Sequence, residues 1–185
     1  MTSEVLNDAK AAMERTLEAT SEDFASVRTG RATPGLFAKV LVDYYGTPTP
    51  LQQLASFTAQ DARTLLIAPY DVSALREIEK ALSDSEVGAN PSNDGKVIRI
   101  VMPELTAERR AEYVKLVKSK AEDHKVSIRN SRRKAKETLE KMVNDGEIGE
   151  DEGKRGEKEL DDLTRKYVDQ VEEMAKNKEQ DLMEV

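Results

Sequence analysis

The chain has 185 residues and a formal net charge of −7; 35% of its residues are charged, only 4% are aromatic and none is tryptophan. So few large side chains favour narrow seams between helices over a thick globular core. The lack of cysteine excludes disulfides and thiolate metal sites, and a single histidine, His124, leaves too few groups for a histidine-based metal site or catalytic triad.

The amino-terminal segment is predicted to form one helix over residues 2–28. Its apolar residues step by three or four along one helical face, and they are Leu6, Ala9, Met13, Leu17, Thr20, Phe24 and Val27. Thr29-Gly30 ends this helix. The segment lacks the regions of a signal peptide, and no apolar run in the chain reaches the ~18 residues that span a membrane. We therefore expect a cytoplasmic protein that does not enter membranes.

Residues 31–104 predict a compact unit of mixed α/β type. Strands are expected at 36–45, 55–58, 64–68 and 96–102. Ser73 is expected to cap a helix over 73–83. Two segments are expected to be turns or loops: 46–50, because it contains two prolines, and 88–95, which is rich in glycine and asparagine.

Two further long helices follow. The first is predicted over 106–144, with Thr106 as its N-cap, and its apolar seam includes His124, which we expect to be a core residue. The second begins with Glu150-Asp151-Glu152, because carboxylates are favoured where helical N–H groups are exposed. Such narrow apolar stripes are stable only when packed together. The sequence thus predicts a three-helix bundle from residues 1–30 and 105–185, with 31–104 as an inserted domain.

Two connections join the predicted bundle to the inserted domain. They are Thr29-Gly30-Arg31 and Pro103-Glu104-Leu105. Gly30 has no side chain and so gives the backbone of the first connection more freedom. We therefore predict a hinge at these two places.

The charge is distributed unevenly along the chain. Residues 105–145 carry 12 Lys/Arg against 7 Asp/Glu, whereas 146–185 carry 7 against 14. Within 125–136 there are six basic residues and no acidic one. Phosphate binding depends on local charge density, so this distribution outweighs the negative total.

Basic residues on the helix predicted over 106–144 recur on one face, at Lys118, Lys125, Arg129, Arg132 and Lys136, and Arg133 lies beside them. We call these six residues the basic stripe. We expect the stripe to flank the core and point outward, where it would bind RNA phosphates. DNA is less favoured, because the acidic last helix would repel a long duplex. The alternative is a solvated face on a coiled-coil adaptor or scaffold, and the residues alone support the two about equally.

Motifs for enzymatic chemistry are missing from the sequence. It contains no phosphate-binding glycine loop, dinucleotide fingerprint, zinc-protease motif, thiol-redox motif or nucleophile elbow. Helix capping accounts for the acidic cluster at 150–152 without a metal. We expect no enzymatic activity, cofactor or metal, so an energy-consuming task would need a partner that hydrolyses nucleotides. A small hydrolase in the inserted domain has no supporting residues.

Several segments along the whole chain resemble the bacterial ribosome recycling factors. The longest and most specific is Tyr44-Tyr-Gly-Thr-Pro-Thr-Pro-Leu51. The others are Val27–Ala32, Gly88–Pro91, Leu105–Arg110, Ile128–Arg133 and Lys178–Met183. The resemblance implies an α+β fold: an elongated antiparallel three-helix bundle with an inserted β/α/β domain, arranged as an L.

The resemblance also implies a function. Members of this family bind the ribosome after termination, with the bundle against the large-subunit 23S rRNA. Together with elongation factor G and GTP hydrolysis by that factor, they split the ribosome into subunits and release mRNA and tRNA. We expect a monomer. The family's RNA contacts carry over onto Arg129, Arg132 and Arg133, with Arg28 and Arg31 as weaker candidates.

Overall fold

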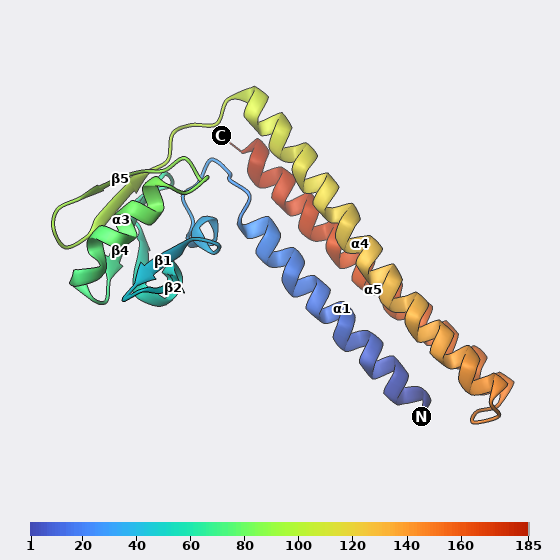
Figure 1. The fold of residues 1–185 in the computed structure, drawn as a ribbon. Coiled ribbons are helices and arrows are strands. Elements are labelled where there is room, and N and C mark those ends of the chain that lie inside the picture. Colours follow the sequence, from blue (N-terminus) through green and yellow to red (C-terminus); the bar gives the residue numbers. More distant parts are fainter. Residues whose placement is uncertain (185) are drawn as a thin grey trace. The chain divides into compact units, whose positions relative to one another are not determined.

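A computed structural model of the chain describes residues 1–184, which fall into two compact units (Figure 1). The first unit is formed by Met1–Phe24 and Leu116–Lys178. The second is formed by Ala25–Lys115 and the residues from Glu179 onward. Long helices combined with a β-sheet confirm the predicted α+β class. The predicted domain boundaries after residues 30 and 104 stay a prediction.

Three long helices supply the first unit: α1 (Thr2–Ala25), α4 (Ala107–Asn144) and α5 (Glu150–Met183). They lie side by side in Figure 1. The hydroxyl of Thr2 donates to Glu152 at 2.7 Å and that of Tyr167 donates to Glu14 at 3.0 Å, so α1 runs parallel to α5. The α4 helix runs antiparallel to both.

The predicted apolar stripes form the seam between these helices. On α1 the buried residues are Ala9, Met13, Thr20 and Phe24, which confirms the predicted face. The helix ends at Ala25, three residues before the predicted end. On α4 the buried residues are Val117, Ala121, Ile128, Ala135, Leu139 and Met142. His124 lies beside this seam with 13% of its side chain exposed, and its Nε2 lies 2.8 Å from Oδ2 of Asp23 on α1.

Two antiparallel sheets build the second unit. A hairpin pairs β1 (Leu41–Tyr44) with β2 (Thr47–Pro50). The larger sheet has the order β3-β4-β6-β5, with its strands at Ala55–Ala59 (β3), Thr64–Pro69 (β4), Ile98–Val101 (β6) and Asn90–Asn93 (β5). The helical segments are η1 (Pro34–Phe37), α2 (Leu51–Leu54), η2 (Val72–Ala74) and α3 (Leu75–Ser83). Apolar side chains of these strands and helical segments form one core, which includes Leu65, Ile67 and Ile100.

Both segments expected to be loops contain strands, so these two predictions are wrong. Pro48 and Pro50 are alternate residues of β2, and because β2 pairs only with β1, their missing N–H groups lie on the unpaired side. Pro91 is accommodated in the same way in β5, at the edge of the larger sheet. A proline therefore excludes a strand only where both sides must be hydrogen-bonded.

Two further local predictions need correction. The strand expected over 36–45 covers only 41–44, because a 3-10 turn occupies Pro34–Phe37. The chain then turns through Tyr45 and Gly46, with φ of 50° and 81°, as a two-residue hairpin requires. The cap expected at Ser73 is instead Asp71, whose carboxylate accepts from the Ser73 N–H at 3.0 Å. A carboxylate is the stronger acceptor, so the helical segment begins earlier.

Candidate nucleic-acid interface

The basic stripe lies on α4, which begins at a local N-cap. The Thr106 hydroxyl accepts from the Arg109 N–H at 3.2 Å, which confirms the predicted cap. From there α4 continues for 38 residues to Asn144. Each residue turns the helix by about 100°, so the residues of the basic stripe lie at different angles around α4 from its buried face.

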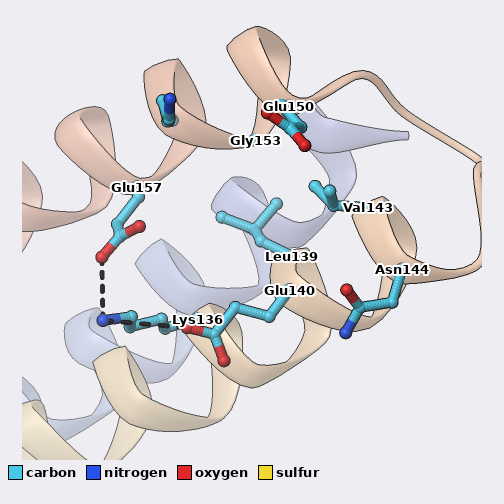
Figure 2. A pocket seen from close by; sticks show the side chains of 9 residues that line it. Lys136, Leu139, Glu140, Val143, Asn144, Glu150, Gly153 and Glu157 are labelled. Carbon is cyan, nitrogen blue, oxygen red and sulfur yellow. Dashed lines mark ion pairs between the residues drawn. The ribbon is translucent and has the colours of Figure 1, made fainter.

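Three cations of the basic stripe lie on the flank that faces α5, and we call Lys125, Arg132 and Lys136 the inner row. Each forms an ion pair with an acidic residue of α5. The Lys125 ammonium lies 2.9 Å from Glu172, and the Arg132 guanidinium lies 2.6 Å from Asp161. The Lys136 ammonium lies 2.9 Å from Glu157, a contact visible in Figure 2.

The expectation that the whole stripe points outward without acidic partners is wrong for the inner row. The side chains of Lys125, Arg132 and Lys136 are 12%, 35% and 36% exposed. The segment 125–136 contains no acidic residue, but Glu122 and Glu140 flank it on α4 and lie 3.0 Å from Lys125 and 3.8 Å from Lys136. Arg132 is paired only from α5, and α5 adds a second partner to each lysine, because residues that flank a helix–helix seam meet the flanking residues of the neighbouring helix.

These contacts keep the inner-row lysines charged. A hydrogen bond to Glu172 raises the pKa of Lys125 above its usual value, and Glu122 adds to the effect. A hydrogen bond to Glu157 raises the pKa of Lys136 in the same way. The two lysines therefore stay charged, but their charge is partly neutralised by the glutamates. These ion pairs help to hold α4 against α5.

The other three residues of the basic stripe remain available, and we call Lys118, Arg129 and Arg133 the outer row. All three are exposed. Within residues 1–184 none of them takes part in an ion pair or a side-chain hydrogen bond. Arg129 and Arg133 lie further around α4 from the seam than the inner row does, and the side chains of all three outer-row residues reach solvent. The outer row is therefore the part of the stripe that can receive phosphates without breaking an existing contact.

Arg28 and Arg31 lie in the second unit, and the structure gives them different surroundings. The Arg28 guanidinium donates to the Pro103 carbonyl oxygen, and its Nε is buried without a hydrogen-bond partner among the described residues. Arg31 is exposed, with its guanidinium 3.7 Å from the Glu184 carboxylate. Arg28 thus has a structural role, whereas Arg31 is accessible to a ligand.

The two predicted hinge connections are adjacent in the second unit. The Ala32 N–H donates to the Ala62 carbonyl at 2.8 Å, and the Met102 N–H donates to the Arg63 carbonyl at 2.8 Å. The turn at 62–63 therefore holds the chain where it enters the sheet region and where it leaves. Thr29 is buried, and its Oγ1 accepts from the Arg31 N–H at 3.2 Å. A hinge motion would have to occur outside these hydrogen bonds.

The structure offers little for other kinds of chemistry. A shallow pocket between α4 and α5 is lined by residues that include Leu139, Val143 and Asn144 beside the Lys136–Glu157 pair (Figure 2). Residues 1–184 contain no group of three or more His, Asp or Glu side chains placed to hold a metal ion. None of their helices combines the length and apolar character needed to cross a membrane.

The acidic partners on α5 were missed by reasoning from the sequence, although a signal existed. Glu157, Asp161 and Glu172 follow one another at intervals of four and eleven residues, which places them on one helical face. The cations of α4 show the same periodicity. Complementary charges at matching spacing on two neighbouring helices indicate that the two charged faces meet.

Comparison with known proteins gives consistent matches along the chain. The family model described as ribosome recycling factor matches residues 20–183. The ribosome-recycling factor of Micrococcus luteus is 75% identical over 185 residues, and that of Streptomyces coelicolor is 56% identical over 185 residues, each with 100% of both chains covered.

Two solved structures are similar over the full chain. A solution structure of the ribosome recycling factor has 35% identity and a TM-score of 0.79, covering 100% of this chain and 98% of that one. The second, at 40% identity and a TM-score of 0.71 with 100% of both chains covered, is titled as models for the Thermus thermophilus ribosome recycling factor and the Escherichia coli elongation factor G bound to the E. coli post-termination complex.

Proposed function

The chain belongs to the ribosome recycling factor family, and on this premise we propose that it binds the post-termination ribosome and takes part in splitting it into subunits, with release of mRNA and tRNA. The splitting step uses elongation factor G and the GTP that this factor hydrolyses. The relative described together with elongation factor G on a post-termination complex supports the choice of partner. The chain acts in the cytoplasm as a monomer and catalyses no reaction itself.

The large-subunit 23S rRNA is the proposed binding partner of the bundle. The observation that carries this is the outer row of exposed, unpaired cations on α4. The packed seam beneath fixes the spacing of their backbone positions, so the helix itself need not be ordered when they meet a phosphate backbone. Arg129 and Arg133 each offer a planar fork for two phosphate oxygens. Arg132 joins them through the part of its guanidinium that Asp161 leaves free.

Force transmission is the second part of the proposal. The bundle of residues 1–30 and 105–185 anchors the molecule on the rRNA. The domain of residues 31–104 receives the push of elongation factor G and swings at the two connections, 29–31 and 103–105. Its core, which includes Leu65, Ile67 and Ile100, is formed by residues of this segment alone, as expected of a domain that moves as one body.

A salt titration of large-subunit binding tests the RNA contact. Phosphate contacts release counterions, so the association constant should fall steeply and linearly on a log–log plot against salt concentration. A coiled-coil adaptor that binds a protein through its apolar seam would show a shallow dependence. Replacement of both outer-row arginines, Arg129→Ala with Arg133→Ala, should lower the slope by about two. An unchanged slope would assign the binding to another surface.

A further inference from the structure

The ion pair between Arg132 and Asp161 uses one edge of the guanidinium. Nε of Arg132 donates to Oδ1 of Asp161 at 2.6 Å, and Nη2 of Arg132 lies 2.6 Å from the same oxygen. A guanidinium has five N–H donors in a rigid plane, and this contact occupies two of them. Within residues 1–184 Arg132 makes no other side-chain hydrogen bond. The remaining donors are the two N–H groups of Nη1 and the second N–H of Nη2, and one N–H from each of these nitrogens forms the Nη1–Nη2 edge at the tip of the guanidinium.

The pair is partly exposed, and no described residue pairs with the Nη1–Nη2 edge. The Arg132 side chain is 35% exposed and that of Asp161 is 44% exposed, so the contact lies at the border of the helix seam. A guanidinium held in this way is fixed in rotation as well as in position, because the carboxylate grips both Nε and Nη2. The Nη1–Nη2 edge has the geometry that binds two phosphate oxygens.

The two lysines of the inner row differ from Arg132 in this respect. The ammonium groups of Lys125 and Lys136 are point charges that rotate freely and have no second edge to orient. Glu172 and Glu157 therefore only neutralise part of their charge. The inner row thus contains a single cation whose acidic partner can improve a phosphate site while also reducing its net charge.

We propose that Asp161 is a positioning residue for RNA binding, which holds Arg132 by its Nε edge so that its Nη1–Nη2 edge is presented to a phosphate of the large-subunit rRNA. This inference rests on the proposed function and assigns a role to a residue of the acidic helix. Without Asp161 the long Arg132 side chain would regain its rotamer freedom, and that freedom would have to be lost again on binding.

Charge alone predicts the opposite effect, which makes the inference testable. Removal of an acidic residue beside a phosphate site lowers repulsion and should tighten binding. Positioning predicts that Asp161→Ala weakens the affinity of the full chain for purified large ribosomal subunits by roughly two- to tenfold. The matched control is Asp162→Ala, which removes the same charge from the next position of α5. Asp162 is exposed and has no ion pair among the described residues, so its removal should leave binding unchanged or slightly tighter.

The salt dependence and a double-mutant cycle separate positioning from a change in fold. Asp161→Ala should lower the log–log salt slope toward that of Arg132→Ala, because one phosphate contact is lost. In an Arg132→Lys background, Asp161→Ala should cause no further loss, since an ammonium needs no orientation. Asp161→Asn keeps an acceptor for the Arg132 N–H groups and should retain most of the affinity. Helicity and thermal unfolding of each variant check that the bundle is intact.

Each outcome decides between the alternatives. If Asp161→Ala binds as tightly as Asp162→Ala, or more tightly, the positioning role is wrong. A loss of equal size in the Arg132→Lys background would also overturn it. If Asp161→Ala fails to fold, the Asp161→Asn variant in the same cycle decides: tighter binding than the unmodified chain, as charge alone predicts, contradicts positioning, whereas a small loss that disappears in the Arg132→Lys background supports it. If the unmodified chain does not bind large subunits at all, the proposed function fails instead.

Discussion

At the scale of single residues, the six cations of the basic stripe are not equivalent. Lys118, Arg129 and Arg133 project into solvent, whereas the inner row shares its charge with α5. An exposed arginine without a partner contributes little to the stability of a helix bundle. Under the proposed function, its removal should weaken binding and leave the fold unchanged, whereas removal of an inner-row residue should weaken binding and also remove a partly exposed ion pair to α5.

The first prediction concerns Arg132→Ala. The substitution should weaken large-subunit binding and slow recycling, because it removes a phosphate contact. Its effect on the free energy of unfolding should be only about 0–1 kcal/mol, since the pair with Asp161 is partly exposed. Binding assays combined with thermal unfolding check both parts. Lys176→Ala, an exposed cation of α5 outside the stripe, serves as the control. A variant that binds and recycles like the unmodified chain would exclude Arg132 from the interface.

A second residue-scale prediction concerns acid stability. Hydrogen bonds from Ser73 and Tyr44 hold the pKa of Asp71 below its usual value. A group with a lowered folded-state pKa stabilises the fold above its unfolded pKa of about 3.9, and that stabilisation is lost as the pH falls through the folded value. Asp71→Asn should therefore lower the melting temperature at pH 7. The difference in melting temperature between the variant and the unmodified chain should shrink as the pH falls toward 2. A difference that grows as the pH falls would contradict this assignment.

At the scale of elements, periodicity predicted more than composition did. The steps of three and four residues located α1, α4 and α5 and their buried faces, because burial imposes this spacing on any packed helix. The prolines at 48, 50 and 91 misled, because their effect depends on which side of a strand is paired, and pairing is a property of the sheet. The two predicted N-caps had different outcomes. The cap at Thr106 is confirmed, whereas Asp71, and not Ser73, caps the other helical segment.

The candidate site was only half predictable for a related reason. The spacing of the cations on α4 follows from the sequence. Which of them face α5 depends on the rotation of one helix against the other, and the packed seam sets that rotation. The sequence therefore does not distinguish the inner row from Arg129 and Arg133. Only the contacts of the inner row with Glu172, Asp161 and Glu157 separate the two groups.

The third prediction tests how closely α4 and α5 approach. Gly153 is buried in α5, and a Cβ there would lie 2.6 Å from Cγ2 of Val143 (Figure 2). Glycine to alanine usually stabilises a helix, but the β-branched Val143 cannot move easily within α4. Gly153→Ala should therefore lower the free energy of unfolding by roughly 1–3 kcal/mol, measured by denaturant unfolding.

Gly149 provides the matched comparison on the same helix. It precedes the first residue of α5, its carbonyl accepts from the Gly153 N–H at 3.0 Å, and nothing lies within 4 Å of its added Cβ. Gly149→Ser should stabilise the chain by a few tenths of a kcal/mol, about the difference between serine and glycine caps. Equal effects of the two substitutions would mean that the α4–α5 contact at Gly153 is not tight.

At the scale of the whole molecule, the account requires two bodies with separate cores and a joint between them. Arg28, which donates to the Pro103 carbonyl, and the turn at 62–63 constrain the chain near the proposed joint. Such contacts limit the number of paths that a swinging domain can take. A joint of this kind should affect the splitting step, in which force is applied, more than the initial binding.

The fourth prediction addresses this joint through Gly30. A Cβ at this position would meet only the Glu184 carbonyl oxygen, at 3.9 Å, so Gly30→Ala should be tolerated. Gly30→Pro fixes the backbone φ angle and should slow subunit splitting more than it weakens ribosome binding. Stopped-flow light scattering and a binding assay on the same preparation measure the two effects. Equal losses of both would argue against a hinge at Gly30.

The most direct test of the central claim is a subunit-splitting assay on post-termination ribosomes. Light scattering would follow dissociation with the chain, elongation factor G and GTP, and with each of the three omitted in turn. The account predicts rapid splitting only when all three are present, and a marked slowing when Arg129→Ala with Arg133→Ala replaces the unmodified chain. Splitting by the chain without elongation factor G and GTP, or full activity of the double variant, would contradict it.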